Sequence, residues 1–396
     1  MQTAMTATAA SLIQSVGRMA EVFREYAASN ERDRRLALPV VEVMKAAGLF
    51  RMWTPRAFGG FEMDPVSALQ VIEEVARLDS AAGWNLQLST GIVPFFAWFP
   101  DQGVEQVWGD SPDLILGGTL FPPGRAVPVE GGYRVSGRWP FVSGCHHASW
   151  FIGPALVMEG SQPRNDANGN PMQLMVVYRA RDAEIVDTWH TVGMRGTGSH
   201  DVVVKDVFVP ARHATILAPL AQPAKGFDGP LYRLTIWSAV AALAAPALGI
   251  ARAAIDAFID LSKKKTPNYT QTALRDRPVV QSQVARAEAT LGAARAYLHH
   301  SLRQAWGSAV CGQMISPEQK ISIQLASSFA MQEAAQAVDL VYTAAGASAI
   351  RLEQPFERHF RDIHVLTQHA FTSASRYESV GKLLLGLDTD WPFFAL

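Results

Sequence analysis

The chain has 396 residues, which is enough for two or three domains with a sizeable buried core. Its 35 basic and 36 acidic residues nearly balance, so the composition indicates neither a nucleic acid nor an anionic membrane as a partner. The two cysteines cannot form a disulfide framework, and no run of about 18 apolar residues predicts a membrane span. We therefore expect a globular protein of the cytoplasm, without a signal peptide.

Residues 9–110 have the apolar spacing of amphipathic helices. Two helices are expected to begin near Pro39 and Pro65, because proline is favoured in the first turn, and a third covers residues 81–87. A loop near residues 53–61 separates the first two helices. The stretch 92–100 is rich in aromatic residues, including Phe95 and Trp98. These rings are either core residues or the wall of a pocket for a flat substrate.

Residues 112–215 change to short β-like runs separated by Gly, Pro and Asn clusters, which is typical of a small antiparallel barrel or sandwich. The central stretch, residues 131–150, opens with a Gly-Gly turn and continues with strand-like alternation. Within it, Phe141, Ser143 and Gly144 offer a ring, a hydroxyl and an accessible backbone. The edge of a flat cofactor needs these groups, although an ordinary strand with Ser143 facing water has the same pattern.

Four Ala-rich amphipathic segments follow, at residues 234–265, 279–307, 317–346 and 356–385. They predict an antiparallel four-helix bundle, because alanine lets helices approach closely. The most apolar stretch, residues 237–253, is interrupted by Pro246 and is expected to be a buried helix. We expect three domains, covering residues 1–111, 112–225 and 226–396.

Standard chemical motifs are absent from the sequence. It contains no GxGxxG after a strand, no GxxxxGK[ST] and no GxSxG, and its ten histidines are not at metal-ligand spacing, so no metal site is expected. His364 and His369 are five residues apart near the start of the last helical segment, so they do not share one helix face. Spacing alone leaves structural and catalytic roles open for both.

Four segments resemble the acyl-CoA dehydrogenase superfamily at matching places. They are residues 46–60, 131–151, 191–210 and 344–362, and the last ends with Arg361-Asp362. The resemblance implies the fold of that superfamily: an N-terminal α-helical domain, a central small β-barrel or sandwich and a C-terminal four-helix bundle. It also implies a homotetramer.

The dehydrogenases commonly keep a catalytic glutamate shortly after this Arg-Asp pair. Here residues 367–372 read TQHAFT and contain no carboxylate to abstract a proton. His369 at this place, with FVSG upstream, resembles the two-component flavin-dependent monooxygenases of the same fold. That group includes oxygenase components for 4-hydroxyphenylacetate, hydroxysteroids, dibenzothiophene and indole-acetate. They oxygenate aromatic or heteroaromatic molecules through a C4a-hydroperoxyflavin, using O₂ and reduced FMN or FAD from a separate NAD(P)H:flavin reductase.

The resemblance also implies residue roles. Ser143 would bond flavin N5, and His369 would act at the C4a side as an acid or base with a pKa near neutrality. Further expected contacts are Thr119, Phe141, Arg195, Thr197 and Ser199 for the cofactor, and Phe95 and Trp98 for the substrate. Residues 91–95 lack the second histidine of some relatives, which favours an indole or another heteroaromatic substrate.

Residues 264–267 read KKTP, where dehydrogenases have an arginine that binds the FAD pyrophosphate. Because lysine cannot make the bidentate contacts of arginine, FMN is slightly favoured over FAD. The alternatives are an acyl-CoA dehydrogenase-like FAD enzyme that oxidises an acyl thioester, and a scaffold that has lost catalysis.

Overall fold

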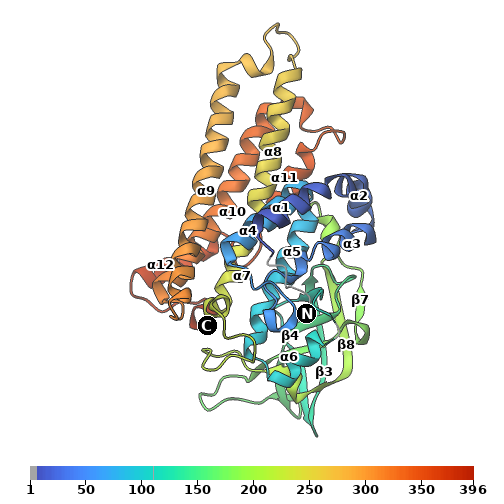
Figure 1. The fold of residues 1–396 in the computed structure, drawn as a ribbon, viewed down its shortest axis with the longest axis vertical. Coiled ribbons are helices and arrows are strands. Elements are labelled where there is room, and N and C mark those ends of the chain that lie inside the picture. The colour runs from blue at the N-terminus through green and yellow to red at the C-terminus, as the bar shows by residue number, and fades with distance from the viewer. Residues whose placement is uncertain (1–6, 110) are drawn as a thin grey trace.

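The computed structural model describes residues 7–109 and 111–396 (Figure 1). Long C-terminal helices form one end of the molecule and the β-sheet forms the other. The N-terminal helices lie between them, with α4 against α8 and α5 against the sheet strand β1. The first hundred residues therefore supply helices that contact both the sheet and the long helices.

The N-terminal part consists of α1 (Ala9–Arg18), α2 (Ala20–Asp33), α3 (Leu38–Ala46), α4 (Pro65–Leu78), α5 (Ser80–Ile92) and α6 (Asp101–Trp108). Pro65 begins α4 as predicted, and the Asp64 side chain caps that helix by accepting from the Ser67 amide. Asp79 caps α5 in the same way, at Ala82. As a result α5 is longer than the predicted helix at residues 81–87, and nearly all of its residues are buried.

The central part holds β1 (Leu116–Gly118), β2 (Gly124–Val129), β3 (Gly132–Val142), β4 (Trp150–Glu159), β5 (Gln162–Pro163), β6 (Gln173–Arg179), β7 (Glu184–Val186), β8 (His200–Pro210) and β9 (Ala214–Thr215). Among the described residues these strands form one sheet, in which seven follow the order β7-β8-β3-β2-β4-β6-β9 and the other two, β1 and β5, each pair with β4. The sheet is mixed, because β4 pairs parallel with both β1 and β2, whereas an all-antiparallel arrangement was expected. β3 lies antiparallel between β2 and β8, and β4 pairs with the other side of β2 and runs in the same direction as β2.

The C-terminal part comprises α7 (Trp237–Ala242), α8 (Ala245–Lys264), α9 (Pro278–Val310), α10 (Pro317–Ala345), α11 (Phe356–Leu366) and α12 (Ser375–Leu384). The predicted fourth long helix, residues 356–385, is wrong as a continuous helix, because residues 367–374 interrupt it. The Thr367 hydroxyl donates to the carbonyl of His364 (2.8 Å), a local bond that competes with helical geometry. The side-chain amide of Gln324 donates to the Phe371 carbonyl (2.7 Å) and stabilises the non-helical path.

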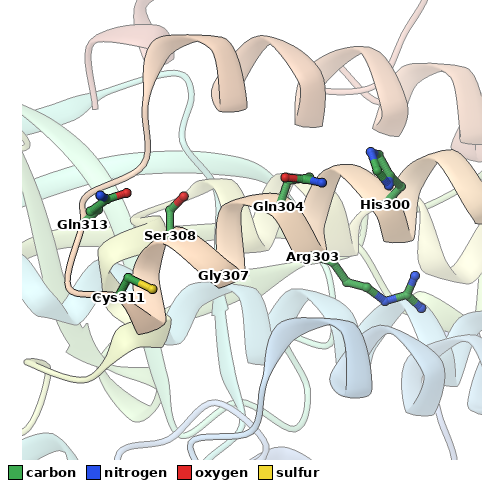
Figure 2. Close-up of a pocket in the computed structure, with 7 residues that line it drawn as sticks. All are labelled: His300, Arg303, Gln304, Gly307, Ser308, Cys311 and Gln313. Atoms are coloured by element: carbon green, nitrogen blue, oxygen red, sulfur yellow. The ribbon is translucent and has the colours of Figure 1, made fainter.

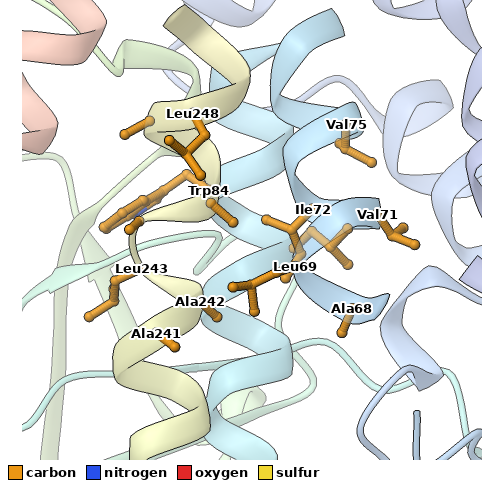
Figure 3. Packing of buried hydrophobic residues seen from close by; sticks show 14 of the residues in the cluster. Ala68, Leu69, Val71, Ile72, Val75, Trp84, Ala241, Ala242, Leu243 and Leu248 are labelled. Atoms are coloured by element: carbon orange, nitrogen blue, oxygen red, sulfur yellow. The ribbon is translucent and has the colours of Figure 1, made fainter. Parts of the chain in front are cut away.

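The core between α4 and the α7–α8 pair shows why small residues are needed here (Figure 3). A Cβ at Gly249 would lie 2.3 Å from the Glu73 carbonyl, so only glycine permits this approach of α8 to α4. Among the described residues, the segment Trp237–Lys264 is long and apolar enough to cross a membrane, with a mean hydropathy of 1.6. Since 89% of its most apolar window is buried in the protein, it is a core element, as the sequence predicted.

Candidate active site

The end of β3 places a ring on the surface and a hydroxyl in the interior. Phe141 has a positive φ of 60°, which breaks the strand alternation and leaves its side chain exposed, at 65%. Its ring meets the edge of the Trp189 ring at 6.1 Å between centroids. Ser143, two residues later, is 5% exposed. The FVSG stretch therefore offers the two groups that the sequence predicted, a free aromatic face and a shielded hydroxyl.

Ser143 lies at one end of a chain of buried hydroxyls. Because Val142 pairs with His200 across β3 and β8, the next residues, Ser143 and Ser199, lie opposite each other. Their Oγ atoms are 2.7 Å apart, and Ser199 Oγ is 2.6 Å from Thr197 Oγ1. The Trp84 indole N–H donates to Ser143 Oγ over 3.1 Å. The structure thus brings together three of the predicted cofactor residues and adds one from α5.

The segment that carries Thr197 is held by Asp362 of α11. Met194 precedes the short 3₁₀ turn Arg195–Thr197, and its amide donates to the Asp362 carboxylate. The Ser80 hydroxyl donates to the same carboxylate, and Arg358 forms an ion pair with it at 3.6 Å. Burial raises the pKa of Asp362, and the Arg358 guanidinium opposes that rise. This carboxylate therefore connects α11, α5 and the hydroxyl chain.

His369 lies in the segment between α11 and α12, and not on a helix as expected. Its ring meets Trp84 at 5.3 Å between centroids, nearly edge to face, and Phe371 at 6.0 Å. Nδ1 is buried without a hydrogen-bond partner in the described part of the chain. Burial lowers the pKa of His369 to about 4, which corrects the expectation of a value near neutrality. At neutral pH the imidazole is uncharged, so it can accept a hydrogen bond, although the lowered pKa makes it a weaker base than a free histidine.

Trp84 joins the two predicted catalytic residues, because it bonds Ser143 and packs against His369. Sequence reasoning missed Trp84, since it treated residues 81–87 only as a helix. One signal was available in residues 80–92, which carry no charge yet include Asn85, Gln87 and Thr90. A helix without charged residues is expected to be buried, and its polar side chains then need hydrogen-bond partners.

Asn85 adds polar groups that no residue in the described chain satisfies. Both its Nδ2 and its Oδ1 are buried without a partner. Its side chain lies beside Gly144, where an added Cβ would be 3.4 Å from Asn85 Cγ. Such groups are expensive to bury unless a ligand or water pairs with them. The arrangement suits a flat molecule whose edge carries both hydrogen-bond donors and acceptors.

Comparisons with known proteins show which family the chain belongs to. Residues 6–101 match the model of the acyl-CoA dehydrogenase N-terminal domain, and residues 241–374 match that of the C-terminal domain. An indole-3-acetate monooxygenase from Pseudomonas putida is 34% identical over 358 residues, which cover 90% of this chain and 89% of that protein. The HsaA oxygenase subunit of a flavin-dependent monooxygenase from Rhodococcus jostii is 28% identical, covering 92% of this chain and 95% of that protein. The structure of XiaF from Streptomyces sp. in complex with FADH2 and glycerol is 27% identical, with a TM-score of 0.89 over 97% of each chain.

The chain belongs to the flavin-dependent monooxygenases of the acyl-CoA dehydrogenase superfamily.

The residues of this monooxygenase fit a flavin. The exposed ring of Phe141 offers a face for stacking, Ser143 offers an oxygen, and Asn85 offers an unpaired donor and an unpaired acceptor. The segment between α11 and α12 carries His369 and no carboxylate, so it lacks a dehydrogenase base at that place. The fit rests on the donor set, and the individual contacts stay predictions.

The remaining predicted residues, two for the cofactor and two for the substrate, have partners within the protein. Thr119 Oγ1 donates to the Phe121 carbonyl at 3.1 Å, at the end of β1, and Arg195 Nε donates to the Glu31 carbonyl at 3.2 Å. Phe95 and Trp98 contact each other in η3 (Val93–Trp98), with ring centroids 6.4 Å apart. The Trp98 indole donates to the Ala218 carbonyl at 2.6 Å. These contacts leave a substrate or cofactor role for the four residues as a prediction.

A separate surface groove of about 450 Å³ lies along the C-terminal half of α9 (Figure 2). It is lined by His300, Arg303, Gln304, Gly307, Ser308, Cys311 and Gln313. None of these residues belongs to the hydroxyl chain or to the surroundings of His369 described above. The groove is therefore a different feature from the candidate active site.

Proposed function

We propose that this chain is the oxygenase component of a two-component flavin-dependent monooxygenase. It takes reduced flavin from a separate NAD(P)H:flavin reductase and uses O₂ to oxygenate an aromatic or heteroaromatic small molecule. The observation that carries the proposal is the joint position of Ser143, Trp84 and His369, with no carboxylate in residues 367–372. The oxygenase names of its relatives, HsaA and an FADH(2)-dependent resorcinol hydroxylase from Rhizobium sp., support a separate reductase.

Reduced flavin, when bound, supplies the electrons that activate O₂. Phe141 would stack on the ring, and Ser143 would bond its N5. Thr119, Arg195, Thr197 and Ser199 would form the surroundings of the cofactor. Trp84, which bonds Ser143 and packs against His369, would keep water out of the space between them.

His369 would receive the proton that the substrate loses. Its neutral imidazole and its unpartnered Nδ1 suit an acceptor for an N–H or O–H group. Aromatic residues continue from His369 through Phe371 to Trp391 and Phe393, with ring centroids 4.6–4.9 Å apart among the last three. This apolar wall suits a flat substrate, and Phe95 and Trp98 would extend it.

We propose an indole-like substrate, because residues 91–95 hold no second histidine to activate a phenol. The similarity to indole-3-acetate monooxygenases supports this choice. We keep a slight preference for FMN over FAD, because Lys264-Lys265 stands where dehydrogenases have an arginine. A homotetramer in the cytoplasm completes the proposal.

Stopped-flow absorbance tests this proposal. Chemically reduced flavin is mixed with O₂ in the presence and absence of the protein, and then with indole or indole-3-acetate. The proposal expects the protein to isolate largely colourless and to change the course of flavin reoxidation. An acyl-CoA dehydrogenase would instead isolate yellow with tightly bound FAD and bleach on addition of an acyl-CoA, and that result would overturn the proposal.

A further inference from the structure

The hydroxyl chain has one favoured direction of hydrogen bonding. At its far end Thr197 Oγ1 lies 2.8 Å from the Met194 carbonyl, which can only accept, so the Thr197 proton points there. A hydroxyl has a single proton, so at the 2.6 Å contact Ser199 must donate to Thr197. By the same count, Ser143 must donate to Ser199 over 2.7 Å. Each of the three hydroxyls therefore donates to the next group in the direction from Ser143 to Met194.

This direction leaves Ser143 able only to accept from a ligand. One lone pair of its oxygen takes the Trp84 indole N–H, and the other is free. The nearby backbone donors are occupied as well, because the Ser143 amide donates to the Phe141 carbonyl (3.0 Å) and the Gly144 amide to the Thr197 carbonyl (2.8 Å). A ligand atom that meets Ser143 therefore has to bring its own proton.

We propose that Trp84, Ser199 and Thr197 are positioning residues that make this site select the reduced flavin. The inference rests on the proposed function, in which Ser143 meets flavin N5. Reduced flavin carries a proton on N5 and so matches a hydroxyl that accepts. Oxidised flavin has a bare nitrogen there, which needs a donor. The resting direction of the hydroxyl chain thus favours the form that a reductase delivers and disfavours the form that remains after turnover.

Reversing the chain would let Ser143 donate to oxidised flavin, but the geometry opposes it. Thr197 would have to turn its proton towards Ser199, which would leave Thr197 Oγ1 and the Met194 oxygen 2.8 Å apart with no hydroxyl proton between them. The loss of one buried hydrogen bond corresponds to a preference for the reduced form of roughly 10- to 100-fold. Asp362 fixes the Met194 amide, and so keeps the carbonyl in place.

The experiment compares the dissociation constants of oxidised and reduced FMN and FAD, the reduced forms under anaerobic conditions. Thr197→Val removes the anchor of the chain at nearly constant volume, so the proton of Ser143 becomes free for oxidised flavin. We expect the ratio of the oxidised to the reduced dissociation constant to fall at least about tenfold, and Thr197→Ser to restore it. Ser199→Ala removes the acceptor of Ser143 directly and should act in the same direction, which guards against misfolding of one variant.

The matched control is Thr191→Val, which removes a hydroxyl that donates to the Gly193 carbonyl (2.8 Å) in the same loop but outside the chain. It should leave the ratio unchanged. A potentiometric titration of the bound flavin gives an independent reading, because each tenfold fall in the ratio lowers the midpoint potential by about 30 mV.

Three outcomes distinguish a failure of the hydroxyl chain's role from a failure of the proposed function. The role of the hydroxyl chain is overturned if Thr197→Val and Ser199→Ala melt normally and keep the wild-type ratio of oxidised to reduced dissociation constants. It is also overturned if that ratio is near one in the wild-type protein, but the proposed oxygenase function is then unaffected. A wild-type protein that binds neither form of flavin contradicts the proposed function itself, and with it the role of the chain.

Discussion

Replacing His369 separates a chemical role from a packing role. His369→Gln keeps nearly the same volume beside Trp84 and Phe371 but removes the titrating ring. If His369 takes the proton of the substrate, product formed per reduced flavin should fall by about 10²–10⁴-fold, the range for a lost general acid or base. His369→Ala should show the same loss of product, and in addition an unfolding free energy lower by about 2–3 kcal/mol from the cavity that it leaves.

The pH dependence of stability gives a second measure of this residue. Burial holds the pKa of His369 at about 4 in the folded protein, below the value of 6.5 for an unperturbed histidine. Between these values the unfolded chain binds a proton that the folded chain does not, so stability is intact above pH 6.5 and is lost as the pH falls towards 4. The loss from His369 is about 2 kcal/mol once the partial exposure of the ring is allowed for. Urea unfolding at pH 7 and pH 4.5 should therefore show a shallower dependence in His369→Gln than in the wild type.

His364→Gln is the matched control. His364 lies on α11, bonds Asp339 at 2.9 Å and has a side chain that is 40% exposed. Its loss should leave product formation near the wild-type value. Near-normal product formation in His369→Gln would refute the catalytic assignment and leave His369 as a packing residue.

Three further predictions concern the surroundings of the site. Ser143→Ala should fold normally and release more hydrogen peroxide and less product per reduced flavin, because it loses a hydrogen bond of about 1–3 kcal/mol; unchanged yields would remove Ser143 from the role. Asp362→Ala should lower the free energy of unfolding by about 3 kcal/mol, because it leaves the half-buried Arg358 guanidinium and the buried Met194 amide less well paired, whereas the exposed Asp276→Ala should change it by less than about 1 kcal/mol. Equal effects of the two in urea titrations would contradict this reading. Phe141→Ala should weaken reduced-flavin binding about tenfold without a change in melting temperature, and Phe208→Ala, also exposed on the sheet, should alter neither; equal affinities of the two variants would exclude stacking on Phe141.

The sequence predicted the fold class because the period of the apolar residues changes twice along the chain. Helical spacing gives way to short β runs and then returns, and local residues such as Asp64 and Pro65 determine where α4 begins. Strand pairing was less predictable. The parallel pairing of β4 with β1 and β2 depends on where the chain crosses the sheet after residue 142, and no local pattern encodes that crossing.

The candidate site was predictable only in part, for a related reason. Ser143, Thr197 and Ser199 lie in motifs, and strand register brings them together. Trp84 enters through a contact between residues 59 positions apart in the chain, so the spacing within α5 could not reveal it. The break around His369 depends on Gln324 in α10, which bonds the Phe371 carbonyl from outside the segment.

The most direct test of the central claim is the fate of molecular oxygen. The purified protein is given chemically reduced flavin, ¹⁸O₂ and indole or indole-3-acetate, with no reductase present, and the products are analysed by mass spectrometry. A monooxygenase that needs only reduced flavin from its partner predicts a product with one ¹⁸O atom per molecule. Product without ¹⁸O, or oxidation of an acyl-CoA with no oxygen transferred to an aromatic ring, would contradict the claim.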